Sequence, residues 1–171
     1  MKYLVGVIAV LVALYFAGWI IESDSQTEPE AADPPGIASS IATPFGLSGE
    51  QWVGAMEKYR GLPYRLGGTG EDGTMDCSGL GWRAGTDLGF TMPRTASHQR
   101  AAATDVIEEG LAKETPGAMV FFFNKNGVLK HVEYSTGKGQ TYAAWVKNGV
   151  GPKPWGWWKG WSWASVEYRK W

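Results

Sequence analysis

Cysteine and histidine are scarce in this sequence, and their scarcity excludes two common ways of stabilising a small domain. The 171 residues include one cysteine, Cys77, and two histidines, His98 and His131. A single thiol cannot form an intrachain disulfide, and one Cys with two His gives no usual zinc-ligand spacing. We therefore expect a fold stabilised by its hydrophobic core and hydrogen bonds, with no metal and no organic cofactor.

A large net charge is also missing. Sixteen Lys and Arg stand against seventeen Asp and Glu, which gives a net charge of −1. Nucleic-acid-binding proteins usually carry an excess of basic residues, so we expect no nucleic-acid partner. The charges are nevertheless unevenly distributed, because residues 22–35 hold five acids and no base, whereas residues 146–171 hold five bases and one acid.

The N-terminus begins with a long apolar stretch. Residues 3–21 are nineteen residues without a charge, and a helix of that length spans most of a hydrocarbon core about 30 Å thick. The stretch is longer than the roughly 7 to 15 apolar residues of a cleavable signal peptide and lacks a clear cleavage site, which favours a transmembrane anchor over residues 1–22. A cleaved signal, or a segment released later as in some phage lysins, is the alternative. Lys2 and the acids that follow the stretch favour an extracytoplasmic position for the rest of the chain.

Residues 23–47 have the composition of a tether. They are rich in Glu, Asp, Ser, Thr and Pro and contain Pro34-Pro35-Gly36, with almost no apolar periodicity. Such a composition is typical of a flexible linker. The remaining residues, 48–171, suffice for one catalytic-sized domain with a single core. We expect this domain to be monomeric.

Helix signals dominate the first half of the domain. Ser48 and Gln51 have the capping-box spacing and predict a helix that runs to Arg60. Asp76 as N-cap and Gly89 as a stop signal bound a second predicted helix. Residues 92–103 can form a short third helix.

Strand signals dominate the second half. The apolar run 118–123 predicts a buried strand, and residues 131–135 and 140–146 predict a hairpin with Gly137-Lys138-Gly139 between its strands. A last strand is predicted over residues 165–171. Helices followed by antiparallel strands indicate an α+β domain in which the helices pack on one sheet.

The lone cysteine has two interpretations, a buried structural residue or a nucleophile. A thiol attacks as its thiolate, which a helix N-terminus and a nearby imidazole both stabilise. Cys77 meets the first condition because it opens the second predicted helix. His98 lies in a polar stretch where we expect a solvated surface residue, whereas a strand can aim His131 at the helix start. His131 is therefore the candidate base.

Five short blocks follow one another in a recognisable order. They are Pro63-Tyr64-Arg65-Leu66-Gly67-Gly68, Asp76-Cys77-Ser78-Gly79-Leu80, Met92-Pro93-Arg94-Thr95 with Gln99, Pro116-Gly117 before Val120-Phe121-Phe122, and His131-Val132. In order and spacing these blocks, over roughly residues 48–146, resemble the NlpC family of papain-like cysteine peptidases. The resemblance implies a papain-like α+β core and hydrolysis of peptidoglycan stem peptides, commonly between γ-D-glutamate and a diamino acid.

The resemblance also implies residue roles. Cys77 matches the nucleophile and His131 the general base. Tyr64 matches a hydroxyl that lines the oxyanion region, and Asp76 and Ser78 match substrate contacts. The implied partner is peptidoglycan, outside the cytoplasm.

One family feature is missing. The family usually places a polar residue, often His, Asn or Gln, about twelve positions after the base to orient its ring, and this position is Ala143. A hairpin centred on Gly137 would place Ala143 opposite His131, and an alanine side chain cannot hydrogen bond. Tyr142 on a bulge, a backbone carbonyl or a water are the alternative orienters.

Two other functions stay open beside the hydrolase. The missing orienter and six tryptophans between Trp155 and Trp171 would fit a non-catalytic wall-binding module, because indole rings stack on sugars and nearby lysines attract anionic polymers. We favour the simpler interpretation that several of these tryptophans complete the core. Thiol acyl transfer on the same fold is the third candidate.

Overall fold

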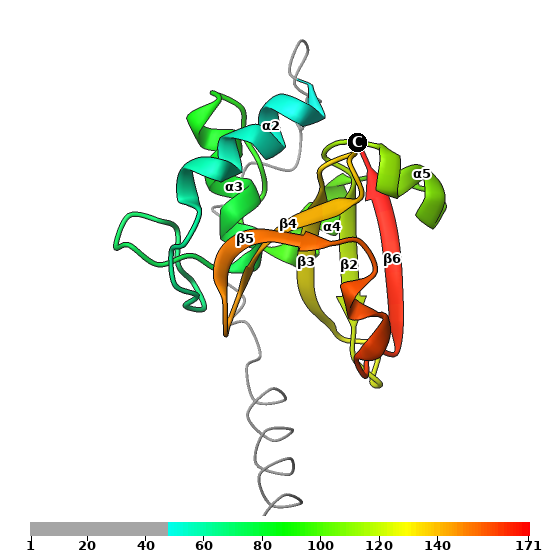
Figure 1. Ribbon diagram of the computed structural model, residues 1–171. Coiled ribbons are helices and arrows are strands. Elements are labelled where there is room, and N and C mark those ends of the chain that lie inside the picture. The colour runs from blue at the N-terminus through cyan, green and yellow to red at the C-terminus, as the bar shows by residue number, and fades with distance from the viewer. Residues whose placement is uncertain (1–47) are drawn as a thin grey trace, which may run out of the picture.

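The computed structural model describes residues 48–171, which form one six-stranded antiparallel sheet with helices packed around it. The predicted α+β class is confirmed. The helical elements are α2 (Gly49–Met56), η1 (Glu57–Tyr59), α3 (Cys77–Asp87), α4 (Ala96–Ala102), α5 (Glu109–Glu114) and η2 (Trp157–Gly160). Figure 1 shows α2 and α3 together near β4 and β5, and α5 next to β6.

The sheet has the strand order β1-β6-β2-β3-β4-β5. Its strands are β1 (Asp105–Val106), β2 (Met119–Phe123), β3 (Leu129–Ser135), β4 (Gln140–Trp145), β5 (Gly149–Pro154) and β6 (Ser165–Lys170). The sequence did not predict β1, α5 or β5. Glycine and proline give β5 a low strand propensity, and it forms at the sheet edge, where a missing proline N–H does not interrupt a ladder.

The predicted anchor (1–22) and linker (23–47) lie outside the described residues. Within residues 48–171, no helix is long and apolar enough to cross a membrane.

Side-chain caps define where the helices begin. The capping box of α2 is confirmed, because the Ser48 hydroxyl accepts from the Gln51 amide and the Gln51 side chain accepts from the Ser48 amide. Asp76 caps α3 as predicted, and Gly89 follows the helix end with φ of 80°. The prediction that the third helix begins at Met92 was wrong: Thr95 caps α4, and the residue before Pro93 is disfavoured in helical conformation.

The two faces of the sheet carry two separate clusters of apolar side chains. Because side chains alternate along a strand, Phe121 and its partner Val132 point to one face, while Phe122 and its partner His131 point to the other. The first face packs against α2, α3 and α4 in the larger core. On the second face, Val120 and Phe122 pack against Trp158 of η2, and Figure 1 shows this turn lying over β2. The C-terminal tryptophans thus supply a second core, the favoured interpretation of that segment.

The packing of α3 on β3 leaves no room for a side chain at position 81. A Cβ on Gly81 would lie 2.3 Å from the Tyr134 hydroxyl oxygen, and Tyr134 is fully buried. We predict that Gly81→Ala destabilises the domain by about 1–3 kcal/mol, because Tyr134 must shift out of its hydrogen bonds. Urea unfolding measures this change. The matched control is Gly54→Ala on α2, where a Cβ meets nothing within 4 Å and helix propensity favours alanine by up to about 1 kcal/mol. Equal effects of the two substitutions would contradict the prediction.

Candidate active site

Cys77 is the first residue of α3, as the sequence predicted. The residue is 2% exposed and belongs to the larger core. Its carbonyl accepts a hydrogen bond from the Tyr134 hydroxyl of β3 at 3.3 Å. The first N–H groups of a helix have no intrahelical acceptor. The start of α3 therefore places the thiol beside the N-terminal backbone amides of the helix and fixes it against the sheet.

The Asp76 carboxylate holds the start of α3 in place. It is 1% exposed, and one oxygen accepts from the Gly79 amide at 2.5 Å while the other accepts from the Gly67 amide at 2.8 Å. Arg94 donates to both oxygens, at 3.0 and 2.5 Å. Ser78, fully buried, donates to the same carboxylate at 3.3 Å. The structure therefore gives Asp76 a positioning role, and the substrate contacts expected of Asp76 and Ser78 stay predictions.

A second network ties α3 and α4 to β3. The Tyr134 hydroxyl donates to the side-chain oxygen Oε1 of Gln99 at 2.7 Å. The side-chain nitrogen Nε2 of Gln99 donates to the backbone carbonyls of Ser78 and Pro93, both at 2.9 Å. The pKa of Tyr134 lies well above its usual value, because of its burial first and then the charges of Cys77 and Asp76. The phenol thus stays protonated at neutral pH and keeps donating.

Tyr64 lies beside the segment that leads into α3. It is half-buried and pairs with Met75 in an isolated parallel bridge. The Met75 amide donates to the Pro63 carbonyl at 3.0 Å, and the Arg65 amide donates to the Met75 carbonyl at 3.1 Å. These bonds hold the backbone of Tyr64 beside Met75, two residues before Cys77, and the oxyanion role of the Tyr64 hydroxyl stays a prediction.

His131 lies on β3 between two aromatic rings. It is 6% exposed. Its ring centroid is 3.9 Å from that of Trp145 on β4 and 5.6 Å from that of Phe122 on β2. The described pairing of β3 with β4 covers Tyr134 and Ser135 only, so at His131 no hydrogen-bonded ladder joins the two strands. Helix α3 contacts both β3 and β4, and the approach of the His131 imidazole to the Cys77 thiol stays a prediction.

Glu133 is a functional candidate that the sequence interpretation missed. It follows His131 by two residues, points to the same face of β3 and is fully buried. One oxygen, Oε2, accepts from the Thr141 hydroxyl and from Trp157 Nε1 at 3.2 Å. The other, Oε1, lies 3.5 Å from His131 Nε2. The sequence feature that could have indicated Glu133 is an acidic residue between Val132 and Tyr134 in a predicted strand.

The predicted placement of Ala143 was wrong by two residues. Tyr134 pairs with Tyr142 and Ser135 with Thr141, so the hairpin is centred on Lys138 instead of Gly137. Gly137 and Gly139 both have φ of 71°, which lets the turn include both glycines. Continuing this register places Ala143 opposite Glu133, and Trp145 opposite His131.

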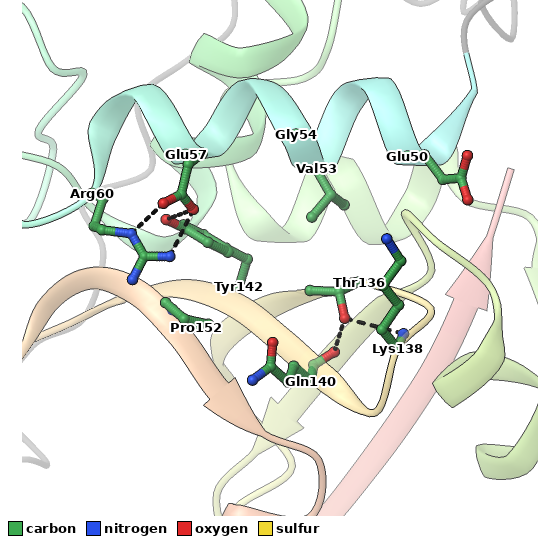
Figure 2. A pocket seen from close by; sticks show the side chains of 10 residues that line it. All are labelled: Glu50, Val53, Gly54, Glu57, Arg60, Thr136, Lys138, Gln140, Tyr142 and Pro152. Atoms are coloured by element: carbon green, nitrogen blue, oxygen red, sulfur yellow. Dashed lines mark hydrogen bonds and ion pairs between the residues drawn. The ribbon is translucent and has the colours of Figure 1, made fainter.

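Tyr142 is occupied elsewhere and does not orient His131. Its hydroxyl donates to Glu57 at 2.7 Å across a cavity of about 400 Å³ between α2 and the β3–β4 hairpin. Figure 2 shows Tyr142 reaching Glu57 and Arg60 at the end of α2, with Lys138 on the hairpin at the other end of the cavity. Burial, followed by the bond to Glu57, raises the pKa of Tyr142. This cavity lies between α2 and the sheet, and neither Cys77 nor His131 lines it.

His98 is half-buried, not fully solvated, and its Nδ1 lies 2.9 Å from the Thr95 hydroxyl. Within the part of the chain that the structure describes, no group of three or more His, Cys, Asp or Glu could hold a metal ion.

The ion pair between Arg94 and Asp76 should dominate the stability of the α3 start. Removing Arg94 leaves a carboxylate that is almost fully buried without its charge partner, and breaking a buried pair typically costs about 3–5 kcal/mol. We predict a loss of this order for Arg94→Ala in urea unfolding. Arg60→Ala removes an exposed pair with Glu57 and should change stability little. An Arg94→Ala variant as stable as Arg60→Ala would contradict the positioning role of Asp76.

Three comparisons with known proteins bear on this geometry. At 34% identity over 87 residues, the chain is similar to the bifunctional muramidase/DL-endopeptidase CwlT of Bacillus subtilis, over 50% of this chain and 26% of that protein. It is 37% identical over 98 residues to the probable endopeptidase p60 of Listeria seeligeri, over 57% of this chain and 18% of that protein. The chain thus spans about a quarter or less of these relatives.

The fold has close solved relatives. The structure of NlpC2 from Trichomonas vaginalis aligns with a TM-score of 0.59 and 26% identity, over 71% of this chain and 46% of that chain. The NlpC/P60 family model matches residues 61–159, a range that includes Cys77, the α3 start and the whole β3–β4 hairpin. The chain belongs to the NlpC/P60 family.

Proposed function

We propose that this protein is a cysteine peptidase that hydrolyses amide bonds in the stem peptides of peptidoglycan, with Cys77 as nucleophile and His131 as general base. The observation that carries the proposal is the position of Cys77 at the start of α3, capped by buried Asp76 and packed on the strand that holds His131. The similarity to proteins named as endopeptidases supports the reaction class.

The first step is attack of the Cys77 thiolate on the amide carbonyl. The positive end of the α3 dipole stabilises the thiolate. The carbonyl oxygen becomes an oxyanion, and the backbone N–H of Cys77 at the start of α3 is the backbone candidate that donates to it. Tyr64 is the side-chain candidate for a second donor.

His131 handles the proton in both halves of the reaction. As imidazolium it donates a proton to the leaving amine when the amide C–N bond breaks, which leaves a thioester on Cys77. As neutral imidazole it then takes a proton from the water that hydrolyses the thioester. The substrate bond that we propose joins γ-D-glutamate to a diamino acid.

The proposed setting is extracytoplasmic. Peptidoglycan lies outside the cytoplasm, and an anchor over residues 1–22 with a linker over residues 23–47 would hold a monomeric domain near the membrane surface facing the wall.

Loss of the thiol should abolish hydrolysis. We predict that Cys77→Ala and His131→Ala each lower the release of stem-peptide fragments from purified cell wall by about 10³-fold or more, because nucleophile and base act as one unit. Mass spectrometry of the digest by the full chain measures the release and identifies the bond cut.

His98→Ala is the matched histidine control, because His98 lies on α4 and bonds to the cap residue Thr95. It should keep activity within a few-fold of wild type. The burial of Cys77 would also fit a structural cysteine, and in that case Cys77→Ala would lower the melting temperature but keep hydrolysis. Wall binding without any released fragment would favour the binding module, and new amide products without net hydrolysis would favour acyl transfer.

A further inference from the structure

We propose that Glu133 orients His131 and so replaces the polar residue that the hairpin lacks at Ala143. The proposal rests on the proposed function, since it assigns His131 a positioning residue. It begins from two buried atoms, His131 Nε2 and Glu133 Oε1, which lie 3.5 Å apart. Neither atom has a hydrogen-bond partner within residues 48–171.

In the proposed site, burial of Glu133 as a carboxylate requires a partner of opposite charge. The side chain is 0% exposed, and a buried carboxylate without a cation is strongly unfavourable. Among the described residues, the one basic group within ion-pair distance of Glu133 is the imidazole of His131. An imidazolium forms in each turn of the proposed reaction, so the carboxylate supplies its counter-charge at the moment when it is needed.

Hydrogen bonds to the other carboxylate oxygen fix the orientation of the Glu133 side chain. Thr141 and Trp157 both donate to Oε2, so Oε1 is the oxygen that faces the ring. A carboxylate accepts from Nε2–H, which leaves Nδ1 as the nitrogen that exchanges a proton with the thiol. The distance of 3.5 Å exceeds a good hydrogen bond, and catalytic contacts of this kind commonly tighten when substrate binds.

The surrounding tryptophans strengthen the interaction. The Trp145 ring lies against His131, and the Trp157 ring meets the Trp145 ring edge-to-face at 4.3 Å. Exclusion of water lowers the local dielectric constant and strengthens the attraction between carboxylate and imidazolium. Trp157 therefore contributes both a hydrogen bond and shielding, and it connects the C-terminal segment to the candidate base.

Glu133→Gln tests the tautomer that this geometry dictates. The amide oxygen of Gln must occupy the Oε2 position, because Trp157 Nε1 can only donate. The amide NH₂ then faces His131 Nε2 and favours the tautomer with the proton on Nδ1, which cannot accept a proton from the thiol. We expect kcat on stem-peptide substrate to fall by about 10²–10⁴-fold, as in hydrolases whose histidine takes the wrong tautomer, with KM within a few-fold and the melting temperature nearly unchanged.

Glu167→Gln is the matched control for a purely structural carboxylate. Glu167 lies on β6, where it binds Arg100 and Arg169, away from His131 in the sheet order. This variant should lower the melting temperature and leave kcat within a few-fold of wild type. A Glu133→Gln variant that behaves in the same way would overturn the proposal.

Moving the polar side chain from position 133 to position 143 tests the same proposal, because it should restore part of the lost activity. Continuing the register of the Tyr134–Tyr142 pair places Ala143 opposite Glu133, so Glu133→Ala opens space that Ala143→Asn can fill with about the same number of atoms. We expect Glu133→Ala to lose at least about 10²-fold in kcat and the Glu133→Ala/Ala143→Asn double variant to regain 10-fold or more of that loss. A double variant as stable as Glu133→Ala but no more active would contradict an orienting role.

Alkylation of the thiol separates this proposal from the proposed hydrolysis. Cys77 is the only cysteine, so its rate of reaction with iodoacetamide at pH 7 reports thiolate fraction and access without any substrate, and the comparison between variants with the same access isolates the thiolate fraction. We expect Glu133→Gln to slow this reaction at least about 10-fold, and Glu167→Gln to leave it unchanged. If the wild type releases no wall fragments while this difference persists, the hydrolase fails and the positioning role stands. If the wild type is active and both variants alkylate and turn over normally, Glu133 is not the positioning residue.

Discussion

The attachment of the α3 N-terminus to β3 is the interaction on which the candidate site depends. Tyr134 reaches across the core from β3 to the Cys77 carbonyl, and Gln99 holds the same phenol from α4. The Asp76 carboxylate and Arg94 fix the preceding loop. Tyr134, Gln99 and Asp76 are buried, so each hydrogen bond that they lose would leave an unsatisfied polar atom in the core. Helix, loop and strand are therefore held in one arrangement.

The side chains of β3 alternate between the two faces of the sheet, and the residues on each face have a different role. Val132 and Tyr134 point into the larger core and bind α3, whereas His131 and Glu133 point to the face covered by the tryptophans. A slip of one residue would exchange these two sets. The register is fixed by five pairs with β2 and by a bulge between Phe122 and Phe123, so the same contacts that build the core also aim the imidazole.

Local signals in the sequence were sufficient for the helices and for the chemistry of their ends. The capping box at Ser48, the Asp76 cap and the Gly89 stop act within a few residues, and each was predicted correctly. The start of α4 was missed although its signals are local, because Pro93 disfavours a helix at Met92 and Thr95 supplies the cap. The edge strand β5 was missed because its glycines and prolines have low strand propensity and it forms by pairing with β4. The hairpin register depended on which of two glycines centres the turn, and a shift of that centre by one residue moved Ala143 by two.

Glu133 shows why the site could be predicted only in part. Cys77 and His131 stand out because they are rare and lie in family-like blocks, whereas an acid in a strand normally indicates a solvated face. Its burial becomes visible only when the C-terminal segment folds back, since Trp157 is 24 residues further along the chain. The aromatic segment that covers the second face of the sheet is thus what turns a surface carboxylate into a buried one. Among the described residues His131 is the basic group within ion-pair distance of Glu133, so the proposed carboxylate–imidazolium pair joins the C-terminal tryptophans to the proposed base.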